Sequence, residues 1–311
     1  MSRLSRRITE VFHVPVHQRA HGVLGTCALR QGRFGEARRH FKQSLALTAP
    51  GGDERNRAAT LDHLSLVEKY LGRFDEALRF ALEALALYRR LDDHAGLALC
   101  LNNLGALHMA REDYRSGLPH LHEALAMCER DGLSGTLPFV LSNLSEVELH
   151  VGNLPAARDH ATRAGEIAQA KGNRAARLWA TLQLGRIAQR EGDLDGARRL
   201  LAEGTAGAAA IGVPSLQCIA VVAFAELLCA DDDRTAAARV LGFAARQPSM
   251  GGLLAESIDA ERQRLALPVD RVPLAIDLAE LLRRIADEAP VAHEPLRALL
   301  HKAERRRTAR A

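Results

Sequence analysis

A pattern that returns every 40 residues constrains this chain more than any other feature of its sequence. A Leu followed by a small residue recurs without insertions, and the sixth copy carries Phe in place of Leu. The six copies are Leu24-Gly25, Leu64-Ser65, Leu104-Gly105, Leu144-Ser145, Leu184-Gly185 and Phe224-Ala225. A fixed period of this length is the signature of a repeat architecture, in which each unit packs mainly on its neighbours. We therefore expect an array of repeats.

Further columns in the same register predict that each unit is two antiparallel helices. Gly32, Gly72, Gly152 and Gly192 follow the Leu by eight residues, where a left-handed residue closes a helix. A second turn is expected at Gly52, Asp92, Gly132, Gly172 and Gly212. Small residues that let helices approach closely fill two more columns. They are Ala37, Ala77, Gly117, Ala157, Ala197 and Ala237, then Ser44, Ala84, Ala124, Ala164, Gly204 and Ala244.

These motifs resemble the tetratricopeptide repeat, most clearly in the copies beginning at Leu24-Gly25 and Leu64-Ser65. The resemblance covers about residues 16–248. The period exceeds the standard ~34 residues, the early Trp column is mostly absent, and no Pro closes each unit. Longer units look like those of bacterial maltose-activator-type regulators, quorum-sensing peptide receptors and kinesin light chains. The resemblance implies an all-α, right-handed superhelical solenoid of about six antiparallel helix pairs with a C-terminal helical cap.

The register also predicts the organisation of the two ends. Residues 1–15 are either an N-terminal cap or the remnant of a preceding repeat, because residues 1–7 stand 40 before a predicted helix. Residues 16–248 carry the six repeats. Residues 249–311 are expected to form a C-terminal helical cap, with helices at about 253–267 and 274–288 and a basic tail.

Composition favours a cytoplasmic protein without a membrane partner. The net charge is +4, but basic and acidic residues are interleaved, which solubility explains. The five cysteines contain no C-x-x-C pair and fall within apolar helical patterns, as in a reducing compartment. No apolar run approaches the ~20 residues that span a bilayer. A basic tail from Lys302 to Arg310 leaves nucleic-acid binding as an alternative function.

The resemblance also predicts where a partner binds. In this family the first helix of each pair lines the concave groove, and the residue before the Leu-Gly position often contacts the backbone of a bound peptide. Here that column is Val23, His63, Asn103, Asn143, Gln183 and Ala223. Asn102, Ser142, Glu146, Arg186 and Arg190 add polar groups nearby. An amide offers both a donor and an acceptor to an extended chain, and Asn is unfavourable inside helices without a reason. The alternative interpretation is that these are solvated surface residues.

No catalytic or metal-binding pattern stands out. The chain has no G-x-x-x-x-G-K-[S/T], G-x-S-x-G or H-E-x-x-H motif. His13, His17 and His21 are spaced four apart, but Pro15 lies between them and no fourth ligand is evident. Asp231, Asp232 and Asp233 are expected to cap a helix. We therefore predict a non-enzymatic scaffold without cofactor or metal that holds an extended or helical polypeptide. An alternative is the sensory arm of a bacterial transcription or signalling system, and the oligomeric state stays open.

Overall fold

A computed structural model describes residues 17–29, 31–48, 53–247, 253–270, 274, 276–288 and 300. All regular structure within these ranges is helical. The proposed N-terminal cap, His13, the turn at Gly52 and the basic tail lie outside the described residues.

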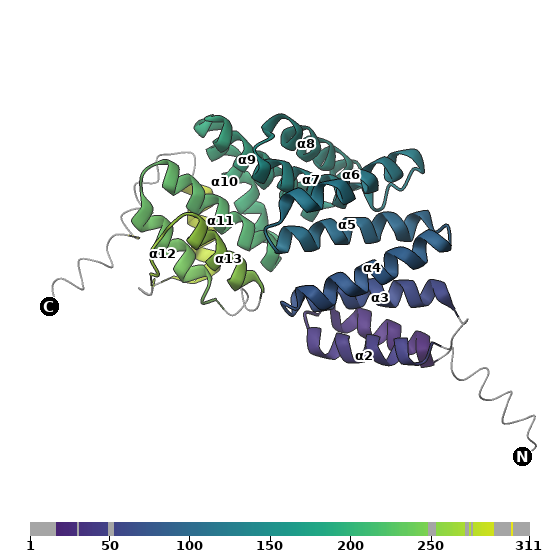
Figure 1. Cartoon of the computed structure of the whole chain (residues 1–311). Helices are drawn as coiled ribbons and strands as arrows, with labels where there is room; N and C mark the ends of the chain where they lie inside the picture. Colours follow the sequence, from purple (N-terminus) through teal and green to yellow (C-terminus); the bar gives the residue numbers. More distant parts are fainter. Residues whose placement is uncertain are drawn as a thin grey trace, which may run out of the picture. The chain divides into compact units, whose positions relative to one another are not determined.

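The helices follow one another in pairs, as the repeat predicts (Figure 1). The first helices of the pairs are residues 17–29, α3 (Glu54–Tyr70), α5 (His94–Ala110), α7 (Leu137–Val151), α9 (Arg174–Glu191) and α11 (Pro214–Ala230). The second helices are α2 (Phe34–Ala46), α4 (Phe74–Arg90), α6 (Tyr114–Arg130), α8 (Leu154–Ala170), α10 (Leu194–Ile211) and α12 (Arg234–Ala244).

The turns between helices use the left-handed residues that the sequence predicts. Gly32 and Gly72 both have φ +70°, a conformation that glycine adopts without a steric penalty. Glu112, at φ +58°, and Asp232, at φ +62°, take the same conformation without being glycine. The second turn repeats the geometry, with Asp92 at φ +51°. Among the described residues, left-handed residues at regular spacing from Gly32 to Asp232 therefore divide the chain into helices.

Acidic and amide side chains then start the helices after many of these turns. Asp93 accepts a hydrogen bond from the Gly96 backbone N–H at 3.0 Å, which satisfies an otherwise unpaired donor. Asp233, the last residue of the Asp run, accepts from the Ala236 N–H at 3.1 Å and confirms the predicted cap.

Small residues let the two helices of a pair approach closely. A Cβ atom added to Gly105 would lie 2.4 Å from Leu121 Cγ, closer than side chains pack. A Cβ atom on Gly204 would lie 2.6 Å from Leu182 Cδ2. Leu121 and Leu182 are fully buried. The small-residue columns of the sequence are thus the contact lines between helices.

The chain divides into two compact units, unit 1 (Met1–Asn143) and unit 2 (Leu144–Ala311), with the boundary inside α7. In unit 1, α3 pairs with α4 and α5 with α6, and α4 packs against α5 of the next pair. In unit 2, α9 packs against both α8 and α10, and α11 pairs with α12.

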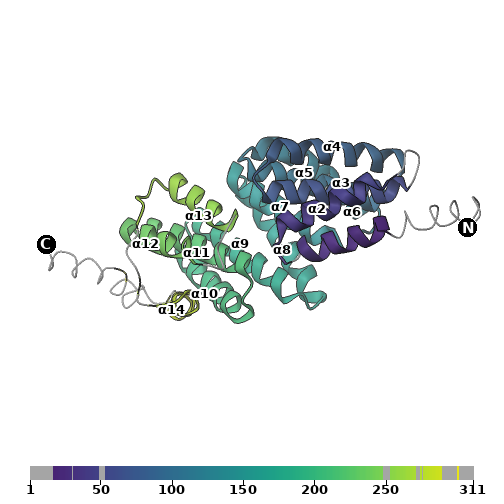
Figure 2. The ribbon, with the colours of Figure 1, turned by 90° about the horizontal axis from the view of Figure 1, so that it is seen from below.

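The helices after α12 extend unit 2. Helix α13 (Leu253–Arg264) packs against α11 and α12, as α5 packs against α3 and α4, so it takes the place of a further first helix. Helix α14 (Leu278–Glu288) packs against α10 and α11 (Figure 2). The buried Arg239 side chain links α12 to this region. Its Nε forms an ion pair with Asp270 Oδ2, at 3.1 Å, and its Nη1 donates a hydrogen bond to the Leu300 carbonyl. The repeat pattern ends near Pro248 in the sequence, but the packing continues by one helix.

Candidate functional site: two polar ladders on the first helices

The predicted binding column forms an amide ladder in unit 1, made of Asp62, Asn102, Asn103 and Asn143. Asn103 Nδ2 on α5 donates to both carboxylate oxygens of Asp62 on α3, at 3.1 and 3.0 Å. Asn143 Nδ2 on α7 donates to Asn102 Oδ1 on α5, at 2.9 Å. Each rung thus joins one first helix to the next.

The amide ladder leaves two side-chain oxygens available to a partner. Asn103 and Asn143 each donate within the ladder through Nδ2, which carries two N–H groups. Neither Oδ1 atom of these two residues accepts a hydrogen bond from a described residue, and an amide oxygen has two lone pairs. The Ser142 hydroxyl donates to the Pro138 carbonyl within its own helix, at 2.8 Å. That these amides offer both donors and acceptors to a partner stays a prediction.

His63 stands at the start of the same column but makes different contacts. Its Nδ1 lies 2.6 Å from the Ala59 carbonyl oxygen, and its ring stacks on Phe41 with centroids 5.0 Å apart. The ring remains partly exposed on α3. His63 therefore packs within the first two pairs and makes no rung to a neighbouring first helix.

Two exposed apolar side chains flank the amide ladder. Leu99 is 41% exposed and Phe139 is 58% exposed. Each lies four residues before a ladder amide, Asn103 or Asn143, and therefore on the same helix face. Large apolar side chains exposed in register on neighbouring helices are a typical feature of interaction sites. The sequence analysis missed this apolar row, although Leu99 and Phe139 share the 40-residue period.

Two ionisable side chains of α3, Asp62 and Lys69, have pKa values that burial shifts. Burial raises the pKa of Asp62, and the Asn103 hydrogen bond opposes this rise. Burial also lowers the pKa of Lys69, on the same helix, to about 8, and the charge of Asp62 opposes that shift. Lys69 still carries its proton for the most part at pH 7.

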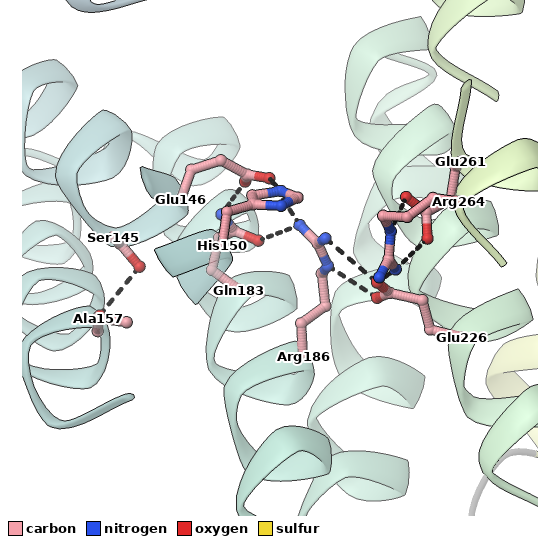
Figure 3. A network of polar contacts seen from close by, with 9 residues as sticks. All are labelled: Ser145, Glu146, His150, Ala157, Gln183, Arg186, Glu226, Glu261 and Arg264. Atoms are coloured by element: carbon pink, nitrogen blue, oxygen red, sulfur yellow. Dashed lines mark hydrogen bonds and ion pairs between the residues drawn. The ribbon is translucent and has the colours of Figure 1, made fainter. Parts of the chain in front are cut away.

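In unit 2 the corresponding helix faces carry an ionic ladder made of Glu146, Arg186, Glu226, Arg264 and Glu261 (Figure 3). Arg186 Nη1 lies 2.9 Å from Glu146 Oε1, and Arg186 Nε lies 2.9 Å from Glu226 Oε2. Arg264 of α13 lies 2.5 Å from Glu226 and also pairs with Glu261. Opposite charges therefore alternate across α7, α9, α11 and α13. This alternation supports the assignment of α13 as a further first helix.

The members of the ionic ladder hold one another in the charged state. Burial alone would raise the pKa of Glu146, but Arg186 and His150 hold it well below its usual range. Burial also opposes ionisation of Glu226, yet Arg186 and Arg264 lower its pKa. The two carboxylates in turn outweigh the burial of Arg186 and raise its pKa. These side chains are thus committed to internal ion pairs.

The remaining predicted binding residues differ in how far their side chains are exposed to solvent. Gln183 is 1% exposed; its Nε2 donates to Glu146, and its Oε1 accepts from Arg186 Nη1 at 3.1 Å. Arg186 is 5% exposed. Arg190, one turn further along α9, is exposed. The structure brings Glu146, Gln183 and Arg186 together, but in an internal network.

Two other kinds of site have no counterpart among the described residues. None of these helices combines the length and apolar character that crossing a membrane requires. Within the same residues, no group of three or more His, Cys, Asp or Glu side chains could hold a metal ion.

Comparison with protein families identifies the repeat. Residues 18–90 and 56–130 both match the tetratricopeptide repeat. The match identifies tetratricopeptide repeats within residues 18–130, and the solved structures that share the helix pairs show that the chain has the fold of a tetratricopeptide repeat array. No curated protein matches the sequence.

Solved structures share the fold at low sequence identity. A Rap protein complexed with competence and sporulation factor is 17% identical, with a TM-score of 0.59 over 80% of this chain and 76% of that chain. Aspartyl phosphate phosphatase F from Bacillus subtilis is 14% identical, with a TM-score of 0.57 over 89% and 79%. BtubC from P. vanneervenii is 20% identical, with a TM-score of 0.56 over 67% and 86%. At these identities the likeness extends to the fold alone.

Proposed function

We propose that this protein is a scaffold that binds a polypeptide partner on the first-helix face of unit 1 and acts by holding it, without catalysis. The observation that carries the proposal is the exposure of Leu99 and Phe139 beside the unused amide oxygens of Asn103 and Asn143. Burial of apolar area supplies the affinity of such a site, and a few polar groups fix the orientation of the partner.

Two further observations support a polypeptide as the ligand. Tetratricopeptide arrays commonly bind proteins, and the fold-related Rap structure is a complex with competence and sporulation factor. Extended peptides and amphipathic helices both fit apolar faces that carry regularly spaced polar groups. Of the remaining predicted contacts, His63 and Ser142 lie on first helices of unit 1 and belong to the proposal as peripheral contacts. Asn102 is buried within the ladder, and Arg190 belongs to unit 2.

Affinity capture with matched variants tests this proposal. Leu99→Asp and Phe139→Asp each place a charge in the apolar row, whereas Leu82→Asp places the same charge on α4 at a similarly exposed Leu (49%). Proteins captured from native lysate by the wild type and by Leu82→Asp are expected to be lost with the other two variants. Equal capture by all four proteins contradicts the proposal. Far-UV circular dichroism checks that each variant is folded.

A further inference from the structure

We infer that the first helix of unit 1, residues 17–29, binds an acidic amphipathic helix of a partner protein in the position that a preceding second helix has in the later repeats. The apolar part of this surface, here called the end stripe, consists of Ala20, Val23, Leu24 and Cys27. It is separate from the α5 and α7 face of the proposed function. Two observations support the inference: what covers the equivalent residues in the later repeats, and the charges beside the end stripe.

The end stripe is both apolar and exposed. Val23 is 63% exposed and Leu24 is 48% exposed, and Ala20 and Cys27 are exposed as well. Their spacing of three, four and seven residues places them along one side of the helix. The opposite side already packs on α2, through Gly25 (Figure 1). An end repeat normally presents a polar outer face, so an apolar one indicates a binding surface.

In the next repeats the equivalents of the end stripe are buried. Leu64 and Leu104 stand 40 and 80 residues after Leu24, and both are 0% exposed. Val67 stands 40 residues after Cys27 and is also 0% exposed. The same column of the repeat is therefore interior wherever another helix precedes it.

The cover in these repeats is the second helix of the preceding pair. Thr60 and Cys100 both correspond to Ala20. The hydroxyl oxygens of Thr60 and of Ser44 on α2 lie 3.5 Å apart, and the Cys100 thiol donates to the Ala81 carbonyl of α4 at 3.5 Å. The repeat thus defines the ligand that fits the end stripe: an α-helix that brings small residues against Ala20.

The charges beside the end stripe favour an acidic ligand. At 100° per residue, His17 and Arg19 border the end stripe on opposite sides, and both are exposed. Within the described part of the chain, Arg19 has no ion-pair partner. Helix 17–29 contains no Asp or Glu. Carboxylates on the ligand therefore meet positive charge only, whereas basic side chains would be repelled.

The repeat also indicates where those carboxylates lie. Helix α4 precedes α5 and packs on it with its C-terminal end beside the α5 N-terminus, since a Cβ atom added to Gly96 would overlap the Tyr88 ring. His17 and Arg19 are likewise at the start of their helix. The acidic residues of the ligand are therefore expected near its C-terminal end.

The same charges disfavour two other occupants of the end stripe. Residues 1–16 of this chain contain three Arg and one Glu. A second copy of the chain, joined end stripe to end stripe across a two-fold axis, would bring another His17 and Arg19 to the interface. Both arrangements place like charges together, which weakens binding. An acidic helix of a different protein avoids this repulsion.

Two helical peptides built on α4 test the inference. Both keep the buried residues of Phe74–Arg90 and are held helical by a hydrocarbon cross-link between the exposed positions 75 and 79. One peptide carries Glu and the other Lys at the exposed positions 86, 89 and 90. In fluorescence polarisation with the full chain, the Glu peptide should bind at least about tenfold more tightly, and high salt should reduce this preference.

Variants of the full chain locate the binding site. Leu24→Asp should weaken binding of the Glu peptide at least about tenfold, and Arg19→Glu should reduce the preference for Glu over Lys. Leu99→Asp, on the face of the proposed function, should change binding less than about twofold. Far-UV circular dichroism checks that each variant is folded. Binding that Leu99→Asp removes and Leu24→Asp spares would overturn the inference and leave the proposed function intact.

Two further measurements detect the other occupants. Light scattering during size-exclusion chromatography would show a dimer that Leu24→Asp dissociates if a second copy covers the end stripe. Mass spectrometry would show Cys27 alkylation by iodoacetamide that is slow in the wild type and faster in the double variant Leu4→Asp, Ile8→Asp if residues 1–16 cover it. We expect neither result. Either one, equal binding of the Glu and Lys peptides, or no binding of both would overturn the inference.

Discussion

Replacing Arg186 by Met tests whether the ionic ladder holds unit 2 together by charge. The change keeps most of the apolar volume but removes the hydrogen bonds to Glu146 and Glu226, each with a closest distance of 2.9 Å. Glu146 keeps His150 and Gln183 as partners, and Glu226 keeps Arg264. Removing one partner from a buried ion pair typically costs about 3–5 kcal/mol, and the remaining partners place this case near the lower end, at about 3 kcal/mol.

The pH dependence of this loss identifies its cause. In the wild type, the pKa values of Glu146 and Glu226 lie below their usual range, so their contribution to stability is complete above the unfolded-state pKa of about 4.3. It is lost as the pH falls through the folded-state values. Arg186→Met removes much of that contribution. The difference in unfolding free energy between wild type and variant is therefore expected to be largest near pH 7 and to shrink below about pH 4.3.

Urea unfolding monitored by far-UV circular dichroism measures the difference, and hydrogen exchange of α9 and α11 localises it. The quadruple variant Glu146→Met, Gln183→Met, Arg186→Met, Glu226→Met removes both charges that Arg186 neutralises and the buried amide that bonds to Glu146 and Arg186, while Arg264 keeps Glu261. We expect its stability to lie within about 1 kcal/mol of the wild type, because well-packed apolar residues often replace buried ion pairs without loss. A quadruple variant as unstable as the single one, or a loss in Arg186→Met that does not vary with pH, would refute the electrostatic explanation.

Three further changes test the packing and the turns. Gly72→Ala, at φ +70°, should destabilise the protein by about 1–2 kcal/mol, whereas Glu112→Gly, at φ +58°, should stabilise it by up to about 1 kcal/mol. Thermal melts of both variants measure these shifts, and equal effects of the two changes would contradict the turn assignment. Gly105→Ala should lower the free energy of unfolding in urea by about 1–3 kcal/mol, because the added methyl group meets Leu121. Combined with Leu121→Ala, it should show a favourable coupling energy, and strictly additive losses of unfolding free energy would contradict the contact. Arg239→Met should speed hydrogen exchange in α12 and α14 more than in α5, and uniform exchange would contradict its role in holding the C-terminal region.

The period of the sequence predicted the helix pairs and turns because each column has a local steric cause. A left-handed residue at 32 or 72 and a small residue at 105 or 204 are required wherever the chain reverses or two helices meet. These constraints involve residues near in sequence or in the same unit, so a single sequence displays them. The predicted helix at 253–267 was found at Leu253–Arg264, a difference of three residues at its end.

The use of each polar side chain could not be predicted in the same way. Asn103 and Gln183 occupy one column, but Asn103 bonds to Asp62 of the preceding first helix whereas Gln183 bonds to Glu146 and Arg186. The outcome depends on partners about 40 residues away and on the rotamers that packing allows. The exposure of Leu99 could not be predicted either, because Leu99 and the partly buried Trp179 share a column that is apolar from Ala59 to Ile219.

Photo-crosslinking in living cells tests the central claim, that a polypeptide is held on the first-helix face of unit 1. A photoreactive phenylalanine analogue is placed at position 99, at position 139 or, as the control on α4, at position 82. We expect the same protein or peptide to be crosslinked from positions 99 and 139 and not from position 82. Crosslinking from position 82 alone, or equal crosslinking from all three positions, would contradict it.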